Sequence, residues 1–242
     1  MERFIRSITE VTDGDELAVV MEAIARDLGF QYFALTHHVD VRYAASAIRL
    51  HNYPARWADY YDRHALGVTD PVHRASHRTS IGFPWSRIPA LIPLSSGDRR
   101  TLDQGRAEGI GEGFTVPAHV PGEARGSCTF ASETGRPIHP ENFPLAQLAG
   151  SFAFEAARHL WRTRTLGDPP GPVLTDRQRD CVLWAARGKG DWEISRILGV
   201  SQETVAMHIK QARERYGVPK RSLVAIRALF DGTLSFDDIL RR

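Results

Sequence analysis

The sequence predicts an α+β chain of two domains, an N-terminal α-β-α sandwich around an antiparallel sheet and a C-terminal all-α domain. Strand-like runs occur in pairs between helical stretches in the first part, whereas the second part contains only helical stretches. Between the two parts, residues 165–173 contain three prolines and two glycines, which neither a helix nor a central strand tolerates. We therefore expect one domain at 1–164, a linker at 165–173 and a second domain at 174–242.

The elements of the first domain follow from apolar spacing and from capping residues. Apolar residues from Leu17 to Leu28 recur at helical spacing and predict an amphipathic helix. Further helices are expected at 54–64, after the Asp70-Pro71 pair, at 96–108 and at 140–162. Runs rich in apolar, β-branched and aromatic residues predict strands at 30–37, 44–50, 113–119 and 127–131. This order favours an antiparallel sheet with helices packed on its faces.

The C-terminal part reads as three short helices whose joints carry capping signals. Thr175 and Gln178 form a capping-box pair, and Gly188 suits the left-handed residue that ends a helix. Ser201 begins a third helix that runs to Tyr216 and carries polar and basic side chains. This layout is typical of a helix-turn-helix that reads DNA. The plainer alternative is a small helical bundle with a solvated polar face.

Charge is distributed unevenly between the two parts. Residues 172–242 contain 13 basic and 9 acidic residues, whereas residues 1–171 contain 18 basic and 20 acidic ones and no lysine. A modestly basic small domain beside a mildly acidic larger one suits a nucleic-acid partner for the former only. The absence of lysine from the first part also argues against a phosphoacceptor domain, which requires one.

Four motifs of the C-terminal part resemble the LuxR-type helix-turn-helix. They are Leu174-Thr175-x-Arg177, Trp184-x-Ala186-x-Gly188-Lys189, Glu193-Ile194-x-x-Ile197-Leu198 and Ser201-x-x-Thr204-Val205-x-x-His208. The resemblance implies double-stranded DNA as a partner, with Met207 and Lys210 facing the major groove. The DNA-binding residues are then Ser201, Gln202, Thr204, Ala206, Met207, Lys210, Gln211 and Arg213. Ala206 stands where relatives often carry a basic residue that reads bases. The target DNA sequence of this protein is therefore not inferred from the usual target of the family.

The middle of the first domain resembles the autoinducer-binding domain of quorum-sensing LuxR regulators, which detect N-acyl-homoserine lactones. Trp57, Tyr61, Asp70, Pro71, Trp85 and Gly113 match in type and spacing, and Tyr53 and Thr129 fall at ligand-contact positions. The resemblance implies that the Trp57 indole donates to the lactone carbonyl, Asp70 accepts from the amide N–H and Tyr53 binds the amide carbonyl. Tyr61 and Trp85 would pack on the ligand, and Thr129 would bind a 3-oxo or 3-hydroxy group.

Each of these residues also has a simpler explanation. Asp70 before Pro71 is a natural helix cap, and both roles coexist if one carboxylate oxygen caps and the other meets the ligand. Trp57 and Tyr61 at helical spacing are often core residues. His73 and His77 are four residues apart, as metal ligands can be, but no third ligand is evident. We therefore expect no metal and no cofactor, only a small-molecule ligand.

The whole sequence is thus interpreted as a ligand-responsive transcriptional regulator that binds a palindromic promoter site as a homodimer. It lacks a transmembrane run and a signal peptide, and its two cysteines suit reduced thiols, so we expect a cytoplasmic protein without a membrane partner. One alternative is a LuxR-type solo regulator that senses a non-lactone molecule. An enzyme such as a lactone hydrolase is disfavoured, because no nucleophile has an evident histidine partner in the sequence.

Overall fold

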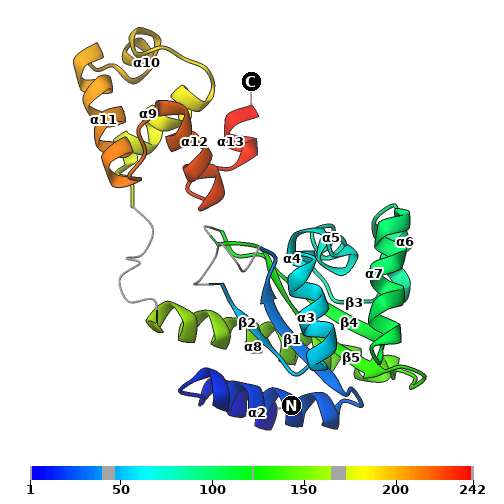
Figure 1. Cartoon of the computed structure of the whole chain (residues 1–242). Coiled ribbons are helices and arrows are strands. Elements are labelled where there is room, and N and C mark those ends of the chain that lie inside the picture. Colours follow the sequence, from blue (N-terminus) through cyan, green and yellow to red (C-terminus); the bar gives the residue numbers. More distant parts are fainter. Residues whose placement is uncertain (1, 40–46, 122, 165–172, 241–242) are drawn as a thin grey trace. The chain divides into compact units, whose positions relative to one another are not determined.

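The computed structural model describes residues 2–39, 47–121, 123–164 and 173–240, and the chain divides into two compact units (Figure 1). The first comprises Met1–His119 and Ala124–Leu166, and the second comprises Val120–Glu123 and Gly167–Arg242. Apart from Val173, the linker predicted at 165–173 lies outside the described residues. The predicted domain boundaries at 164 and 174 therefore stay predictions.

The first unit is built on a five-stranded antiparallel sheet with the order β2-β1-β5-β4-β3. The strands are β1 (Tyr32–His37), β2 (Arg49–His51), β3 (Phe83–Pro84), β4 (Ile110–Ala118) and β5 (Gly126–Glu133). The antiparallel sheet predicted from the sequence is confirmed. The strand expected at 44–50 is shorter and begins at Arg49, and residues 44–46 lie outside the described residues.

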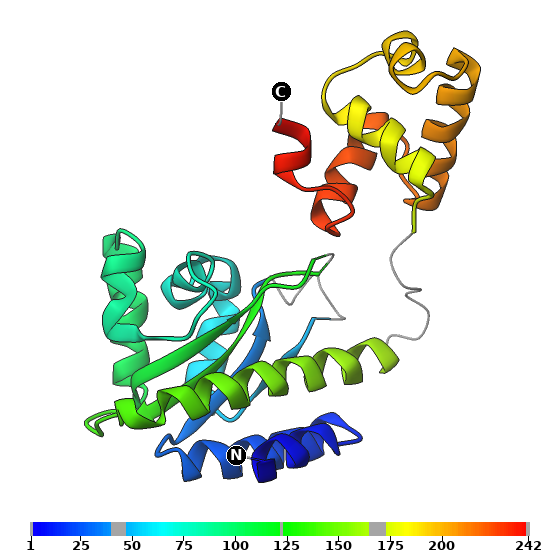
Figure 2. The same cartoon turned by 180° about the vertical axis from the view of Figure 1, so that it is seen from behind.

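One face of this sheet forms the main hydrophobic core. It is covered by α2 (Gly14–Asp27) and α8 (Phe143–Arg164), and α1 (Glu2–Thr9) packs on both of these helices. Figure 2 shows α8 crossing in front of the strands. Alternate strand residues point into this layer, among them Phe33, Leu35, Phe114, Val116 and Phe130, all of them buried. Fully burying each of the larger side chains contributes roughly 1.5–3 kcal/mol. The core therefore gives the opposite face of the sheet a rigid support.

The opposite face is covered by short helices, so the unit is the α-β-α sandwich expected from the sequence (Figure 1). They are α3 (Ala55–Arg63), α4 (Leu66–Thr69), α5 (Pro71–Ser76), the 3-10 turn η1 (Trp85–Arg87), α6 (Ile88–Leu91) and α7 (Ser96–Ala107). Ser95 and Asp98 form a capping box at the start of α7, and Gly109 adopts φ +95° just after its end. Asp98 also accepts a 2.7 Å hydrogen bond from Arg74, which ties α7 to α5.

The second unit is all helical: α9 (Asp176–Ala186), α10 (Asp191–Leu198), α11 (Gln202–Arg215), α12 (Arg221–Phe230) and α13 (Phe236–Leu240). The predicted joints are present. Thr175 and Gln178 form the capping box, Gly188 adopts φ +82°, and the Ser201 hydroxyl accepts from the Thr204 amide over 3.2 Å. Ile197 of the Glu193-Ile194-x-x-Ile197-Leu198 motif is 43% exposed and lies outside the core of this unit. The helix-turn-helix arrangement of α10 and α11 is as predicted, and α12 and α13 extend it.

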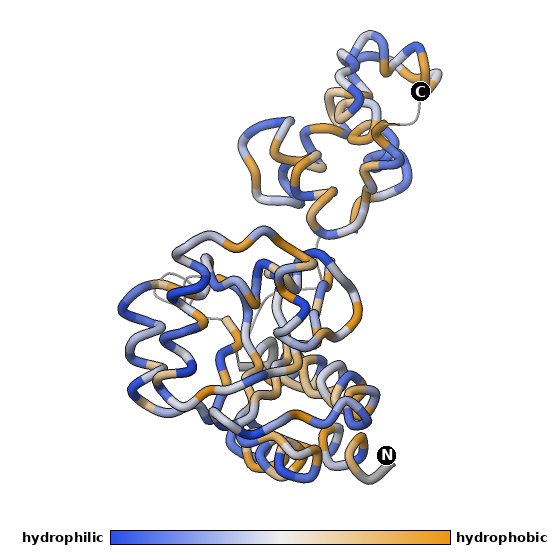
Figure 3. The backbone as a smooth tube through the Cα atoms, turned by 90° about the vertical axis from the view of Figure 1, so that its right-hand side faces the viewer, coloured by the Kyte–Doolittle hydropathy of each residue, from blue (hydrophilic) through white to orange (hydrophobic). Residues whose placement is uncertain are grey.

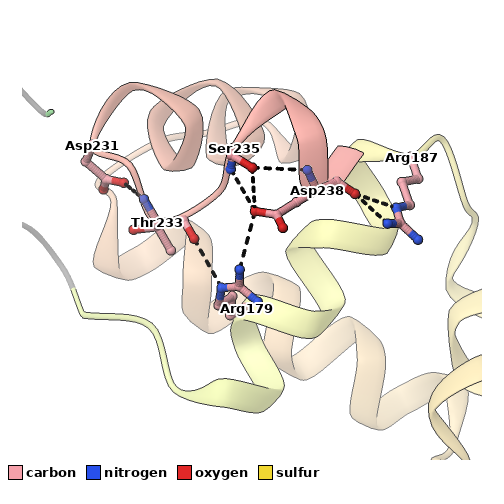
Figure 4. Close-up of polar contacts among 6 residues, drawn as sticks. All are labelled: Arg179, Arg187, Asp231, Thr233, Ser235 and Asp238. Atoms are coloured by element: carbon pink, nitrogen blue, oxygen red, sulfur yellow. Dashed lines mark hydrogen bonds and ion pairs between the residues drawn. The ribbon is translucent and has the colours of Figure 1, made fainter. Parts of the chain in front are cut away.

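Arg179 of α9 and Arg187, the residue that follows this helix, fasten the end of the described chain to the helix-turn-helix (Figure 4). The Arg179 Nε donates to the Thr233 carbonyl over 3.1 Å, and its Nη2 lies 3.5 Å from Asp238 Oδ2. The Arg187 guanidinium donates to the Asp238 carbonyl over 3.0 Å. Since a cation near the last carbonyls of a helix is favourable, these contacts also stabilise α13, which is only five residues long.

Hydrophobic residues are dispersed along both units rather than gathered in one long segment (Figure 3). Among the described residues, no helix is both long and apolar enough to cross a membrane.

Candidate functional site

The short helices α3 to α7 and the sheet enclose a cavity of about 460 Å³ in the first unit. Strand alternation provides its floor: Ala34 and Thr36 of β1 and Thr129 of β5 line it, while their neighbours Phe33, Leu35 and Phe130 point into the core on the other face. A cavity of this size is within the range of small-molecule pockets. All six residues predicted to contact a ligand line it, namely Tyr53, Trp57, Tyr61, Asp70, Trp85 and Thr129.

Trp57 and its neighbours on α3 form an aromatic wall of this cavity. Trp57 is 7% exposed and meets Tyr61 edge to face, with ring centroids 5.7 Å apart. Its indole lies against Gly105 of α7. Within the described residues the structure shows no hydrogen bond to the Trp57 indole nitrogen or the Tyr53 hydroxyl. Both groups are therefore free to bind a molecule in the cavity.

Asp70 connects α3 with α5 through both of its carboxylate oxygens. Oδ1 accepts a 2.7 Å hydrogen bond from the Val72 amide and so caps α5, as the Asp70-Pro71 pair predicts. Oδ2 accepts a 2.9 Å hydrogen bond from the Tyr61 hydroxyl. Burial, together with this carboxylate, raises the pKa of Tyr61 well above its usual value, so the phenol stays protonated and donates. Each carboxylate oxygen has a further lone pair, so Oδ2 can accept from a ligand as well.

Trp85 and Thr129 are joined by a residue that the sequence analysis missed. The Trp85 indole donates to Thr115 Oγ1 over 2.9 Å, and that hydroxyl lies 2.9 Å from Thr129 Oγ1. Thr115 and Thr129 are direct partners across the β4–β5 ladder, and Thr115 is fully buried. Gly113 lets the Trp85 ring lie on the strand, because a Cβ there would come within 2.6 Å of the ring. Trp85 can therefore pack on a ligand, but its N–H is already used.

Polar residues that the sequence analysis did not single out line the cavity near β2. They include Thr36, Arg49, His51 and His73. Arg49 forms an ion pair with Asp62 of α3 over 2.6 Å. The His73 Nδ1 lies 3.0 Å from the Gly67 carbonyl, so this nitrogen carries the proton and Nε2 is left toward Thr36, 3.5 Å away.

His73 also belongs to a cluster of histidines. Its ring stacks on His38 with centroids 3.8 Å apart, and His38 joins His77 over 2.8 Å and Ser127 over 2.9 Å. Burial, then the neighbouring histidines, lower the pKa of His38 well below its usual value. Burial and Arg125 lower the pKa of His77 to about 4. Stacked rings cannot turn their nitrogens toward one ion, and no His, Cys, Asp and Glu group of the described residues is placed to hold a metal.

The exposed face of α11 in the second unit carries most of the residues predicted to bind DNA. Ser201 and Gln202 lie at its N-terminus, and Ala206, Met207 and Lys210 are exposed along it. Thr204 is half-buried, and its hydroxyl lies 3.1 Å from that of Ser201. Free amides at a helix N-terminus suit a phosphate, and exposed side chains further along can reach base edges.

Two further residues predicted to bind DNA are partly covered. Gln211 is half-buried, because its Oε1 accepts a 3.0 Å hydrogen bond from Gln178 Nε2 of α9. Arg213 is also half-buried, and its Nε has no hydrogen-bond partner among the described residues. Both side chains are thus less exposed than those of Gln202, Ala206 and Lys210 on the same helix. Gln211 instead fixes α11 against α9, and Arg213 retains only part of its guanidinium for contact with solvent or DNA.

Comparison with protein families finds two matches, one to the N-terminal part of the chain and one to the C-terminal part. The model of the autoinducer binding domain matches residues 13–157. The model of bacterial regulatory proteins of the luxR family matches residues 172–228. The first covers the cavity and the second covers the helix-turn-helix.

Curated relatives are similar along nearly the whole chain. The transcriptional activator protein AhyR of Aeromonas hydrophila is 25% identical over 235 residues, covering 96% of this chain and 90% of the relative. The putative HTH-type transcriptional regulator y4qH of Sinorhizobium fredii is 29% identical over 242 residues, covering 94% of this chain and 72% of the relative. The crystal structure of Escherichia coli SdiA matches with a TM-score of 0.68 at 22% identity, and the match covers 99% of this chain and 98% of the SdiA chain. This similarity shows a shared fold.

Proposed function

The chain belongs to the family of autoinducer-binding, LuxR-type transcriptional regulators of quorum sensing, and we propose that its own autoinducer is an N-acyl-homoserine lactone. We further propose that the protein binds a palindromic promoter site as a homodimer. The family consists of transcriptional regulators, so the cavity serves to bind a small-molecule ligand and not to turn it over.

The observation that carries the lactone proposal is the grouping of complementary polar atoms around one cavity. The Trp57 indole N–H and the Tyr53 hydroxyl are donors without a partner among the described residues, and Asp70 Oδ2 is an acceptor held by Tyr61. A homoserine lactone headgroup offers a lactone carbonyl, an amide carbonyl and an amide N–H. We assign Trp57 to the lactone carbonyl, Tyr53 to the amide carbonyl and Asp70 to the amide N–H. Tyr61 and Trp85 pack on the ligand, and Thr129 can meet a 3-substituent.

Ligand binding would act on the regulator through stability. A ligand that binds only the folded state stabilises it by about 2.7 kcal/mol at a hundredfold excess over its dissociation constant. The ligand would thereby raise the fraction of folded first units that can pair. A two-fold dimer presents two copies of α11, which favours DNA half-sites about one helical turn apart. Because its target is promoter DNA, we propose that the protein acts in the bacterial cytoplasm.

The lactone proposal is tested by identifying what the purified protein retains. The full chain is expressed with a panel of N-acyl-homoserine lactones, purified, and its extracted ligand identified by mass spectrometry. We expect one lactone to be retained and to raise the thermal midpoint of the first unit. Trp57→Phe, which keeps an aromatic ring but removes the N–H donor, should lose retention. The matched control is Trp192→Phe, because Trp192 is exposed in the other unit and should not affect retention.

Two outcomes would contradict the proposal. Equal retention by Trp57→Phe and the unsubstituted protein would overturn the role of the indole. Retention of a non-lactone molecule, with no lactone changing stability, would overturn the ligand class and leave the regulator assignment intact.

The dimer and its DNA site are tested together. Selection from a random duplex library should enrich a two-fold symmetric sequence, and light scattering should give twice the monomer mass for the liganded protein. An asymmetric enriched sequence bound by a monomer would contradict this part of the proposal.

A further inference from the structure

The cavity is polar at one end, and the strand register shows which end this is. On β1, Tyr32 is paired with Ala131 of β5, and Ala131 belongs to the cluster of Trp57 and Ile110. Thr36, four residues further along β1, is paired with Arg49 of β2. Four residues of an antiparallel strand span about 13 Å. Thr36 and Arg49 therefore lie at the end of the cavity far from Trp57, beyond Ala34 and Thr129 in the middle.

Charged and hydrogen-bonding groups surround this distal end. Arg49 pairs with Asp62 through one nitrogen, but a guanidinium has five N–H donors. His73 directs Nε2 toward Thr36. A smaller hollow of about 30 Å³, room for roughly one water-sized group, adjoins this end and is lined by residues that include Thr36, Arg49, Asp62 and His73.

His51 adds an unsatisfied polar atom in the middle of the cavity, where its strand partner is Ala34. Its Nδ1 is buried and has no hydrogen-bond partner among the described residues, and its ring stacks on Tyr53. Burial and Arg49 lower the pKa of His51, which keeps the ring neutral. A buried polar nitrogen without a partner is costly unless water or a ligand satisfies it. An alkyl tail would leave this nitrogen without a partner.

Resting on the proposed lactone function, we infer that the distal end selects an acyl tail that carries a neutral oxygen group, a hydroxyl or a keto oxygen, at its far end. An oxygen there accepts from Arg49, and a hydroxyl can also donate to His73 Nε2, because Nδ1 donates to the Gly67 carbonyl. A terminal carboxylate fits less well, because Asp62 already neutralises Arg49 and would repel a second anion.

A competing path for the tail exists within the same cavity. Val72, Ile88, Leu94 and Leu102 form an apolar part of its lining, which belongs to the core cluster of α5, α6 and α7. A plain alkyl tail would follow this apolar wall and avoid Arg49. The two paths make opposite predictions about tail chemistry, so the preference between matched tails distinguishes them.

The test compares N-octanoyl-L-homoserine lactone with its ω-hydroxyoctanoyl and ω-carboxy counterparts of equal chain length, by calorimetry on the full chain. We expect the ω-hydroxy compound to bind about tenfold more tightly than the alkyl compound, the value of one well-made hydrogen bond. The double variant Arg49→Met with Asp62→Leu removes the whole ion pair, so that neither charge is left without its partner. It should reverse the preference for the ω-hydroxy compound. Thr36→Val is a milder variant that should reduce it if the double variant does not fold.

The outcomes separate this inference from the proposed function. If the alkyl tail binds as tightly as the ω-hydroxy tail, or the carboxylate binds best, the inference is overturned and the lactone proposal stands. The inference is also overturned if the variants leave the preference unchanged. If no compound with the lactone headgroup binds the unsubstituted protein, the proposed function itself is contradicted.

Discussion

The Tyr61 hydroxyl donates to Oδ2 of Asp70 over 2.9 Å, while the other oxygen of the same carboxylate caps α5. The carboxylate is thus oriented by two hydrogen bonds before any ligand arrives. A group fixed in this way loses little freedom on binding, so more of its interaction contributes to affinity. One residue thereby links the folding of α5 to the binding site.

Substitutions at Asp70 should separate these two roles. Asn is as good an N-cap as Asp, so Asp70→Asn keeps the bond from Val72 but removes the charged acceptor. We expect it to lower lactone affinity roughly ten- to hundredfold with a small loss of stability. Asp70→Ala also removes the cap and leaves the Tyr61 hydroxyl without its acceptor, and should lower the free energy of unfolding by about 2–3 kcal/mol. Calorimetry and urea unfolding measure the two effects, and equal stability of both variants would contradict the capping role.

Thr115 should matter more to stability than Thr129, although only Thr129 is predicted to meet the ligand. Thr115→Val strands both the Trp85 indole N–H and the Thr129 hydroxyl, whereas Thr129→Val leaves the Trp85–Thr115 bond in place. We expect Thr115→Val to lower the free energy of unfolding by about 2–4 kcal/mol and Thr129→Val to lower it by about 1 kcal/mol, both measured by urea titration. A larger loss for Thr129→Val would show that Thr115 is not the centre of this network.

Gly113 should be intolerant of any side chain. A Cβ at this position would lie 2.6 Å from the Trp85 ring, so Gly113→Ala must displace the indole and break its bond to Thr115. We expect a loss of about 1–3 kcal/mol and reduced ligand retention. Gly97→Ala is the matched control. Gly97 lies in the first turn of α7, its Cβ would make only ordinary contacts, and alanine there should be neutral or slightly stabilising. Similar thermal midpoints for the two variants would contradict the steric argument.

Capping signals were predictable from the sequence because their chemistry is local. Thr175 with Gln178, Gly188 and Ser201 each act on backbone groups within a few residues, and the structure confirms all three joints. Gln211 shows the limit of this reasoning. Its partner Gln178 lies 33 residues away, so helical spacing could not reveal that α9 covers it.

The cavity was predictable only in part for the same reason. Family resemblance selected six residues that do line it. Arg49 and His73 also line it, and Thr115 supports Trp85 and Thr129 from beneath, because of strand register and the packing of α5. Pairing Thr115 with Thr129 requires knowing which strands are neighbours and in which register. The strand β3 is two residues long and contains Pro84, so no period-two pattern could indicate it.

The histidine cluster should make stability fall as the pH is lowered. The pKa of His77 is about 4 in the folded state, below the usual 6.5, so the unfolded state binds more protons between these values. Stability is therefore full above about pH 7 and declines toward pH 4. Because His77 is only partly buried, the slope that it contributes stays below about 1.4 kcal/mol per pH unit. The positive charge of Arg125 and the neighbours His73 and His119 act in the same direction.

His77→Gln tests this origin of the pH dependence, because glutamine can still bond to His38 but does not titrate. Urea midpoints measured from pH 7 to pH 4.5 should decline less steeply for the variant. Parallel profiles for the two proteins would assign the pH dependence to other groups.

Lys210 should contribute to DNA affinity without carrying most of its sequence preference. Its side chain is 73% exposed on α11, and its Nζ lies 3.9 Å from Glu214, too far and too solvated to hold it tightly. If Lys210 contacts a phosphate, Lys210→Gln should weaken binding to all sequences alike and reduce the salt dependence of log K by about one. Glu214→Gln is the control on the same helix and should leave binding unchanged or tighter, since it removes an anion beside the DNA. Fluorescence anisotropy over a range of salt concentrations measures both slopes. A loss confined to one base pair of the site, with an unchanged slope, would instead assign Lys210 to base recognition.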